Sequence, residues 1–145
     1  MGATESNFVN PHGLYDDKHY TTAYDLYLIF NEAIKYSKFV DTLSCMKYTS
    51  SFQGKAAFGD YSISCSYTNS NGFLTGSYTT PDGIKVYGGK AGYTEAARRS
   101  YVMLAESNNG HKYIVITMRA ESNSLMYKDL TALLKKIPVD KKSYA

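Results

Sequence analysis

The sequence predicts an α+β fold in which helices pack against an antiparallel β-sheet. Apolar residues recur at helical spacing near both ends of the chain, and strand-like segments lie between them. Turn signals rich in Asn, Pro and Gly separate neighbouring strand segments by only a few residues. At 145 residues, the chain has the size of one domain.

Residues 1–20 are rich in turn-forming residues, among them Asn10-Pro11-His12-Gly13, and are expected to form a structured loop. A helix should then run from Thr21 to about Ser37. Thr21 or Thr22 is a good N-cap, and Asp25 in the first turn suits the helix dipole. Apolar residues of this segment fall at helical spacing: Ala23, Leu26, Phe30, Ala33 and Ile34.

A second, short helix is expected from Ser37 to about Ser44. It would turn three apolar side chains inward: Phe39, Val40 and Leu43. In the Ser- and Tyr-rich segment that follows, Tyr61, Ile63 and Cys65 alternate with serines, which predicts a half-buried strand. Residues 69–72 (Asn-Ser-Asn-Gly) are expected to form a turn.

Three further strands are expected in the last third of the chain. The first begins at Ile84 and continues to about Thr94, after a Thr-Pro-Asp-Gly turn at residues 80–83. The others cover residues 101–105 and 113–118, and Asn108-Asn109-Gly110 between them predicts a hairpin.

The chain should close with a helix that ends before Pro138. One apolar stripe is expected along it: Met126, Leu130, Leu133, Leu134 and Ile137. Lysines 135, 136, 141 and 142 are interpreted as favourable for the helix C-terminus and as part of a solvated tail over residues 138–145. Contact with a membrane surface is the alternative.

Composition excludes several classes of protein. Sixteen Lys and Arg against 13 Asp and Glu give a net charge of +3, which is too small to indicate nucleic-acid binding. Two cysteines exclude a disulfide-dense scaffold, and the three scattered histidines give no zinc signature, so neither metal nor cofactor is expected. Cys45 and Cys65 are either a disulfide or two buried thiols. Tyrosine is in excess, with 15 residues against 6 Phe and no Trp.

No apolar run reaches the length of a transmembrane segment, and the N-terminus lacks the basic and apolar regions of a signal peptide. If the whole protein is exported, we therefore expect its signal to lie outside this chain. Lys90, flanked by Gly89, Ala91 and Gly92, is the most suggestive residue, because small neighbours leave a strand backbone open to a ligand. Ser44-Cys45-Met46-Lys47 fits Ser-x-x-Lys, but it lies at the end of a predicted helix and is interpreted as accidental.

Two stretches resemble a known family. The segment Asn7-Phe8-Val9-Asn10-Pro11-His12-Gly13-Leu14, followed by residues 19–26, resembles serine-type D-alanyl-D-alanine carboxypeptidases, the low-molecular-weight penicillin-binding proteins. The Lys-Thr-Gly strand of that family resembles the segment Gly88-Gly89-Lys90-Ala91-Gly92-Tyr93-Thr94. The family's Asn-x-Asn segment, which precedes the loop into that strand, resembles Asn69-Ser70-Asn71. The likeness covers residues 5–136. It implies the C-terminal part of a catalytic domain with a β-lactamase/transpeptidase-like fold.

The resemblance also implies roles for individual residues. The expected substrate-binding residues are those of the strand motif: Lys90, Ala91, Gly92 and Thr94. The expected structural residues are those of the loop-to-helix segment: Asn10, Pro11, His12, Gly13, Thr21, Thr22 and Asp25. The implied ligand of the whole protein is a peptidoglycan stem peptide or a β-lactam, bound outside the cytoplasm.

The sequence departs from the family in several places. The nucleophile and Ser-x-Asn motifs are absent, so no catalytic residue is expected here and the chain alone should be inactive. Ala91 replaces the threonine of Lys-Thr-Gly, and Arg98-Arg99 stand where the family prefers Ala-Gly and a small or aromatic residue. Met126 lies near the position of an arginine that the family uses for the substrate carboxylate, with Arg119 or Lys128 as alternative sources of that charge.

These departures leave two other hypotheses open. One is a degenerate, non-catalytic relative that binds cell-wall peptide or a protein partner. The other is a small tyrosine-rich adhesion or oligomerisation domain. For this last hypothesis, an incomplete sheet would present unpaired edges and an apolar face, so we expect self-association through an exposed edge.

Overall fold

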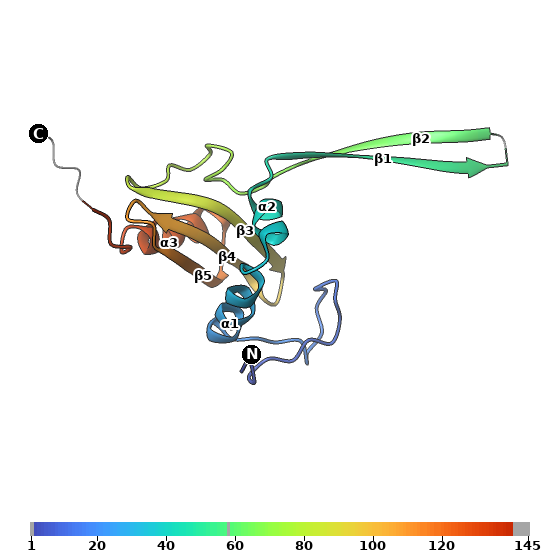
Figure 1. The fold of residues 1–145 in the computed structure, drawn as a ribbon. Helices are drawn as coiled ribbons and strands as arrows, with labels where there is room; N and C mark the ends of the chain where they lie inside the picture. Colours follow the sequence, from blue (N-terminus) through green and yellow to red (C-terminus); the bar gives the residue numbers. More distant parts are fainter. Residues whose placement is uncertain (1, 58, 141–145) are drawn as a thin grey trace, which may run out of the picture.

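The structure, a computed structural model, describes residues 2–57 and 59–140. In these residues the chain forms three helices and five strands (Figure 1). The elements are α1 (Ala23–Ala33), α2 (Ser37–Ser44), β1 (Lys47–Ala56), β2 (Gly59–Thr68), β3 (Ile84–Thr94), β4 (Arg98–Ser107), β5 (Lys112–Ala120) and α3 (Asn123–Leu134). None of these helices is long and apolar enough to cross a membrane. The end of the predicted tail, from Lys141 on, lies outside the described residues.

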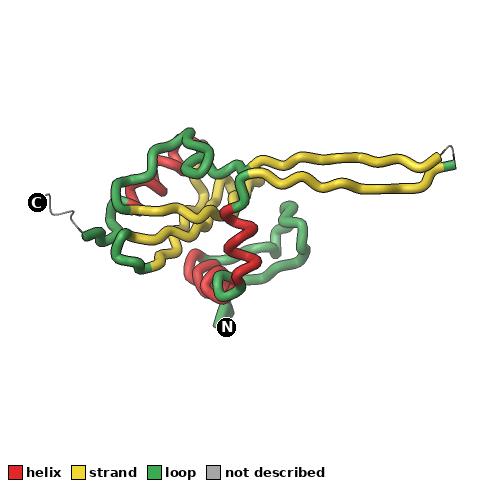
Figure 2. The backbone as a smooth tube through the Cα atoms, turned by 45° about the horizontal axis from the view of Figure 1, so that its top comes forward, coloured by secondary structure: helices red, strands yellow, loops and turns green. Residues whose placement is uncertain are grey.

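Strands β3, β4 and β5 form the central antiparallel sheet in that order. Side chains alternate along β4, so that Tyr101 and Met103 pack with α3 whereas Leu104 packs with α1 and α2. Helices therefore cover both faces of the sheet (Figures 1 and 2). The predicted fold class is confirmed. Strand β3 has the predicted bounds, whereas β4 (10 residues) is twice as long as predicted and β5 (9 residues) extends beyond its predicted bounds at both ends.

Helix α1 ends earlier than predicted. After Ala33 the backbone tightens into a turn, in which the N–H of Tyr36 donates to the carbonyl of Ala33 (3.1 Å). Tyr36 then has an extended backbone and is the N-cap of α2. Helix α2 has the predicted bounds, and the three side chains expected to turn inward pack in one cluster: Phe39, Val40 and Leu43.

Ser122 is the N-cap of α3, and its Oγ accepts from the N–H of Leu125 (3.1 Å). Most of the predicted stripe is buried: Met126, Leu130, Leu134 and Ile137. Leu133 is the exception, with 37% of its surface exposed. Adjacent helical residues point about 100° apart, so Leu133 and Leu134 do not both face the sheet.

Strands β1 and β2 form a hairpin that projects away from the rest of the chain (Figures 1 and 2). The prediction of a half-buried strand is wrong, since Tyr61 and Ile63 are 49% and 51% exposed, and β1 was not predicted. The alternation does separate two faces: Phe52 pairs with Ile63 on one, and Ser51 Oγ lies 3.1 Å from Ser64 Oγ on the other. Within the described residues, however, the apolar face remains largely open to solvent.

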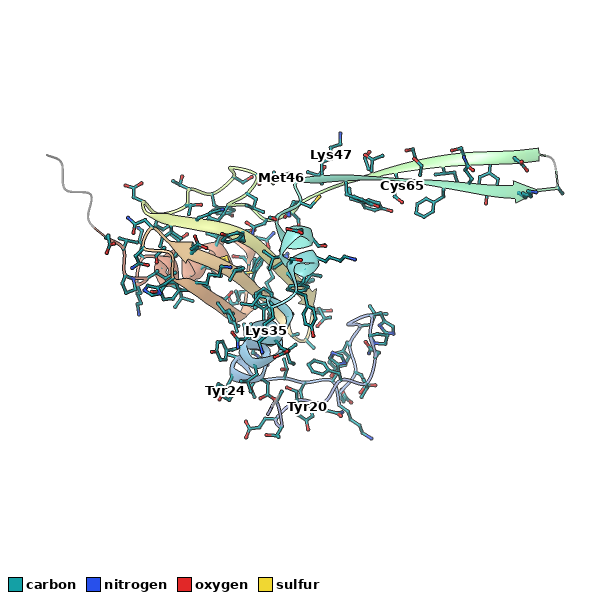
Figure 3. The ribbon with its side chains drawn as sticks, in the orientation of Figure 1. Tyr20, Tyr24, Lys35, Met46, Lys47 and Cys65 are labelled. Atoms are coloured by element: carbon teal, nitrogen blue, oxygen red, sulfur yellow. The ribbon has the colours of Figure 1, made fainter. Side chains whose placement is uncertain are left out.

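The two cysteines are free thiols. Cys45 follows α2 and is exposed, whereas Cys65 pairs with Ser50 in the hairpin and is half-buried (Figure 3). Neither alternative from the sequence, a disulfide or two buried thiols, describes this arrangement.

The segment that leads from the hairpin to β3 (residues 69–83) packs against helix α3 through tyrosine side chains. The ring of Tyr127 stacks on Tyr78 with centroids 3.9 Å apart and meets the edge of Phe73 at 5.3 Å. The Tyr127 hydroxyl also accepts from the N–H of Gly72 (2.7 Å). Part of the tyrosine excess thus has a structural role.

We expect Tyr127→Phe to lower the free energy of unfolding by about 1–2 kcal/mol, because the buried N–H of Gly72 loses its acceptor. Urea denaturation followed by circular dichroism measures the change. Tyr36→Phe is the matched control, since Tyr36 is exposed and should stay within about 0.5 kcal/mol of the wild type. Equal changes in the two variants would contradict the assigned role.

Candidate functional site

The N-terminal loop forms one wall of the candidate site. Asn7 and Tyr20 make an isolated β-bridge, in which the N–H of each donates to the carbonyl of the other (2.9 and 3.0 Å). The bridge closes the base of the loop just before α1, at Tyr20, which is labelled in Figure 3. The Asn-Pro-His-Gly segment therefore lies in a closed loop rather than in a free tail.

Within the loop, side chains of this segment bind its own backbone. Asn10 Oδ1 accepts from the N–H of Gly13 (2.8 Å), and Asn10 Nδ2 donates to the carbonyl of Leu14 (3.1 Å). His12 Nδ1 accepts from the N–H of Leu14 (3.2 Å). Gly13 has a φ of +74°, and Pro11 restricts the backbone before it. These contacts shape the turn.

Asp25 joins this loop to α1. Its side chain is 2% exposed, and Oδ2 accepts from the N–H of Glu5 (2.8 Å) and from Ser6 Oγ (2.6 Å). The Asp25 N–H in turn donates to Oγ1 of Thr22, the N-cap (3.1 Å). Ser6 Oγ also lies 2.8 Å from Thr21 Oγ1. The cap of the helix and the anchor of the loop are therefore one network.

Asp25→Ala is expected to lower the free energy of unfolding by about 1–3 kcal/mol, because two donors lose a charged acceptor. Hydrogen exchange at the Tyr20 amide should also become faster, since the bridge lies next to the lost anchor. Asp25→Asn, which keeps one oxygen acceptor, is the matched control and should lose less. Unchanged exchange at Tyr20 in Asp25→Ala would show that the network does not hold the loop.

Strand β3 forms the other wall and is an edge strand, pairing only with β4 among the described residues. Two glycines bring it close to its neighbours. Gly88 has a φ of +130°, and a Cβ there would overlap the carbonyl oxygen of Leu43 at the end of α2. A Cβ at Gly89 would overlap the ring of Tyr101. Packing therefore accounts for both glycines that precede Lys90.

The predicted strand residues face in different directions. Lys90 is exposed, donates from Nζ to the carbonyl of Ala91, and pairs with Val102, which packs on the α1 and α2 side. Ala91 pairs with Tyr101 and is half-buried on the α3 side. Gly92 has no heavy atom within 4 Å of the position that a Cβ would take. Its backbone is open to close approach by a ligand.

A cleft of about 580 Å³ separates the two walls. Gly92 and Thr94 line it from β3, and Gly13 and Thr21 line it from the loop side. The structure thus brings residues from both predicted groups together. Lys90 does not line this cleft.

Ala91 belongs to a second, smaller hollow of about 110 Å³, which Arg99 and Met126 also line. Met126 is 3% exposed, so it forms part of the core. The guanidinium of Arg99 lies 4.6 Å from the ring centroid of Tyr93. An arginine is therefore present beside Ala91, but β4 supplies it rather than α3.

Arg98 and Arg119 line the large cleft and were missed as site residues. The sequence marks Arg98 only as a departure from the family pattern, and Arg119 only as one alternative source of charge. They reach one cleft because β4 and β5 are paired. Because they are 21 positions apart in the sequence, their spacing does not predict that they line the same cleft.

Ser44 is poorly placed to be a nucleophile. It is the last residue of α2, and its Oγ donates to the carbonyls of Val40 (3.0 Å) and Asp41 (3.2 Å). Lys47 is the first residue of β1 (Figure 3). The helix N-terminus and the adjacent base that activate a serine are both missing here. In the part of the chain that is described, no group of three His, Cys, Asp or Glu side chains is placed to hold a metal ion.

A family model and two solved structures are similar to this chain. The model of a family described as D-alanyl-D-alanine carboxypeptidase matches residues 1–122. The structure is similar to a D-alanyl-D-alanine carboxypeptidase from Mycobacterium tuberculosis H37Rv, with a TM-score of 0.66, 24% identity, and coverage of 92% of this chain and 47% of that one. A penicillin-binding protein homologue from Mycobacterium tuberculosis gives a TM-score of 0.64 and 27% identity, again over 92% and 47%. A search of curated proteins found no match. The chain spans about half the length of these solved structures.

Proposed function

The chain belongs to the D-alanyl-D-alanine carboxypeptidase family, and on that premise we propose that it supplies the substrate-binding strand of a serine-type carboxypeptidase. Proteins of this family act on cell-wall peptidoglycan outside the cytoplasm. The proposed substrate is a peptidoglycan peptide that ends in D-Ala-D-Ala, with a β-lactam as its inhibitory analogue.

The open edge of β3 carries this proposal. A peptide that adds to an edge strand gains main-chain hydrogen bonds, and Gly92 leaves that backbone uncovered. The exposed ammonium of Lys90 on the same strand offers a charge to an anionic end group. The loop fastened by Asp25 would bound the peptide on the far side of the cleft.

The nucleophile is proposed to come from outside these 145 residues. Its Oγ would attack the carbonyl of the penultimate D-Ala, the C–N bond would break, and the terminal D-Ala would leave with a proton on its amine. Water would then hydrolyse the acyl-enzyme and restore the serine. This chain alone is therefore expected to be inactive.

Release of D-alanine by the natural protein tests the proposal. A peptide ending in D-Ala-D-Ala should release D-alanine, and the same peptide ending in L-Ala should release at least about 100-fold less, since stereochemistry decides how the end group lies on the strand. No release from the D-Ala-D-Ala peptide would reject a carboxypeptidase.

A degenerate relative that binds cell-wall peptide or a protein partner is the second candidate. Ala91 favours it, because a methyl group half-buried against the α3 side replaces the hydroxyl expected to hold the substrate carboxylate. Binding of the D-Ala-D-Ala peptide without release of D-alanine supports this candidate, and turnover rejects it.

We expect the isolated chain to self-associate. The outer edges of β3 and of the hairpin are unpaired among the described residues, and the hairpin exposes Phe52 and Ile63. Light scattering should show a mass that rises with concentration. Phe52→Ser with Ile63→Ser should reduce the rise, whereas Tyr24→Ser, at an exposed position on α1, should not. A concentration-independent monomer would contradict this expectation.

A further inference from the structure

Two arginines have an unusual backbone conformation. Among the described residues, Arg98 (φ +58°) and Arg119 (φ +61°) are the only non-glycine residues in the left-handed region. Neither has the short polar side chain that tolerates this region. Glycine would adopt this backbone conformation at both positions without strain, so an arginine at each position indicates a role for its side chain.

Both strained arginines line the large cleft. Arg98 opens β4 after a turn in which the N–H of Ala97 donates to Thr94 Oγ1 (3.1 Å). Arg119 lies where the register of β4 and β5 shifts, and its N–H is 3.4 Å from Ser100 Oγ. Two separate irregularities, a turn and a bulge, thus bring cationic side chains to one end of the sheet.

The opposite wall of the cleft is acidic. Asp16 and Asp17 line it from the N-terminal loop. No ion pair joins either aspartate to either arginine, because the one pair within 4.0 Å in the described part of the chain is Lys35 with Glu32. A purely anionic ligand would be repelled by the aspartates, and a purely cationic one by the arginines. Both carboxylates accept hydrogen bonds within their own loop, Asp16 from the N–H of Lys18 (2.8 Å) and Asp17 from the Tyr15 hydroxyl. Separated charges of opposite sign that form no ion pair with each other fit a ligand that carries both.

We propose that this cleft binds a zwitterionic amino-acid group on the peptide, with its carboxylate at Arg98 and Arg119 and its ammonium at Asp16 and Asp17. The proposal rests on the proposed function only in taking the ligand to be part of a peptide substrate. Arg–carboxylate contacts are charge-assisted and geometrically specific, which gives a reason to keep two strained arginines where glycine would fit.

Three small probes test the ligand chemistry on the full chain. Nε-acetyl-lysine presents both charges, Nε-acetyl-lysinamide only the ammonium, and Nα,Nε-diacetyl-lysine only the carboxylate. Titrations followed by NMR at the amides of Thr94 and Arg98 should give a Kd for the first probe at least about 10-fold lower than for either other probe, as expected for the loss of one charged contact. Equal affinity for all three, or no shift with any, would overturn the proposal.

Glycine variants separate binding from structure. Arg98→Gly and Arg119→Gly relieve the backbone, so each should keep or raise Tm while weakening Nε-acetyl-lysine binding at least about 10-fold. Lys38→Ala, at an exposed position on α2 away from the cleft, is the charge-matched control and should bind as the wild type does. A fall in Tm with binding intact would mean that the arginines serve the fold. These titrations need no nucleophile, so they can fail or succeed independently of D-alanine release.

Discussion

Met126→Arg is expected to unfold much of the protein rather than restore a missing carboxylate-binding arginine. Met126 is 3% exposed and packs in the core cluster between α3 and the sheet. A guanidinium there would be buried without a carboxylate partner, which costs about 3–5 kcal/mol. Urea denaturation should show the loss as a lower midpoint.

Ala91→Thr is the matched control, because Ala91 is only half-buried and borders the small hollow. We expect it to change the free energy of unfolding by less than about 1 kcal/mol. It should also raise β-lactam acylation of the natural protein, since it supplies the missing hydroxyl. A well-folded Met126→Arg protein would show that the start of α3 opens toward the site, contrary to the structure.

Gly88→Ala is the second large expected effect, with a loss of about 3 kcal/mol or more. The new Cβ would overlap the Leu43 carbonyl oxygen, and alanine is strained at a φ of +130°. Because Gly88 lies two residues before Lys90, separation of β3 from α2 would also move the proposed substrate strand.

Gly92→Ala provides the control on the same strand. Nothing lies within 4 Å of its added methyl group, so the free energy of unfolding should change by less than about 1 kcal/mol. Peptide binding by the natural protein should nevertheless fall, because the methyl group covers the backbone that a peptide would approach. Equal stability losses at positions 88 and 92 would contradict the packing that distinguishes the two glycines.

The sequence predicts most of the central sheet and its helices, because their patterns are local. The Thr22 cap, the Pro81-Asp82-Gly83 turn and the apolar periodicity of α3 each act within a few residues. The prediction that the strand with Tyr61 and Ile63 is half-buried was wrong for a different reason. Alternation shows that a strand has two faces, but not whether anything covers them.

The site is predictable only in part. Gly92 and Thr94 from the strand motif, and Gly13 and Thr21 from the loop-to-helix segment, line the cleft. The arginine wall is not predictable, because a φ near +60° at Arg98 and Arg119 arises from a turn and a register shift between paired strands. The spacing of the two arginines along the chain does not predict that pairing of strands.

Labelling of the natural protein with a fluorescent penicillin, followed by mass spectrometry of the labelled peptide, tests most directly whether this chain is the substrate-strand part of a larger active site. We predict one acylated serine, located outside residues 1–145, and no labelling of the isolated chain. An adduct on Ser44, or on any other serine of these 145 residues, would contradict the account.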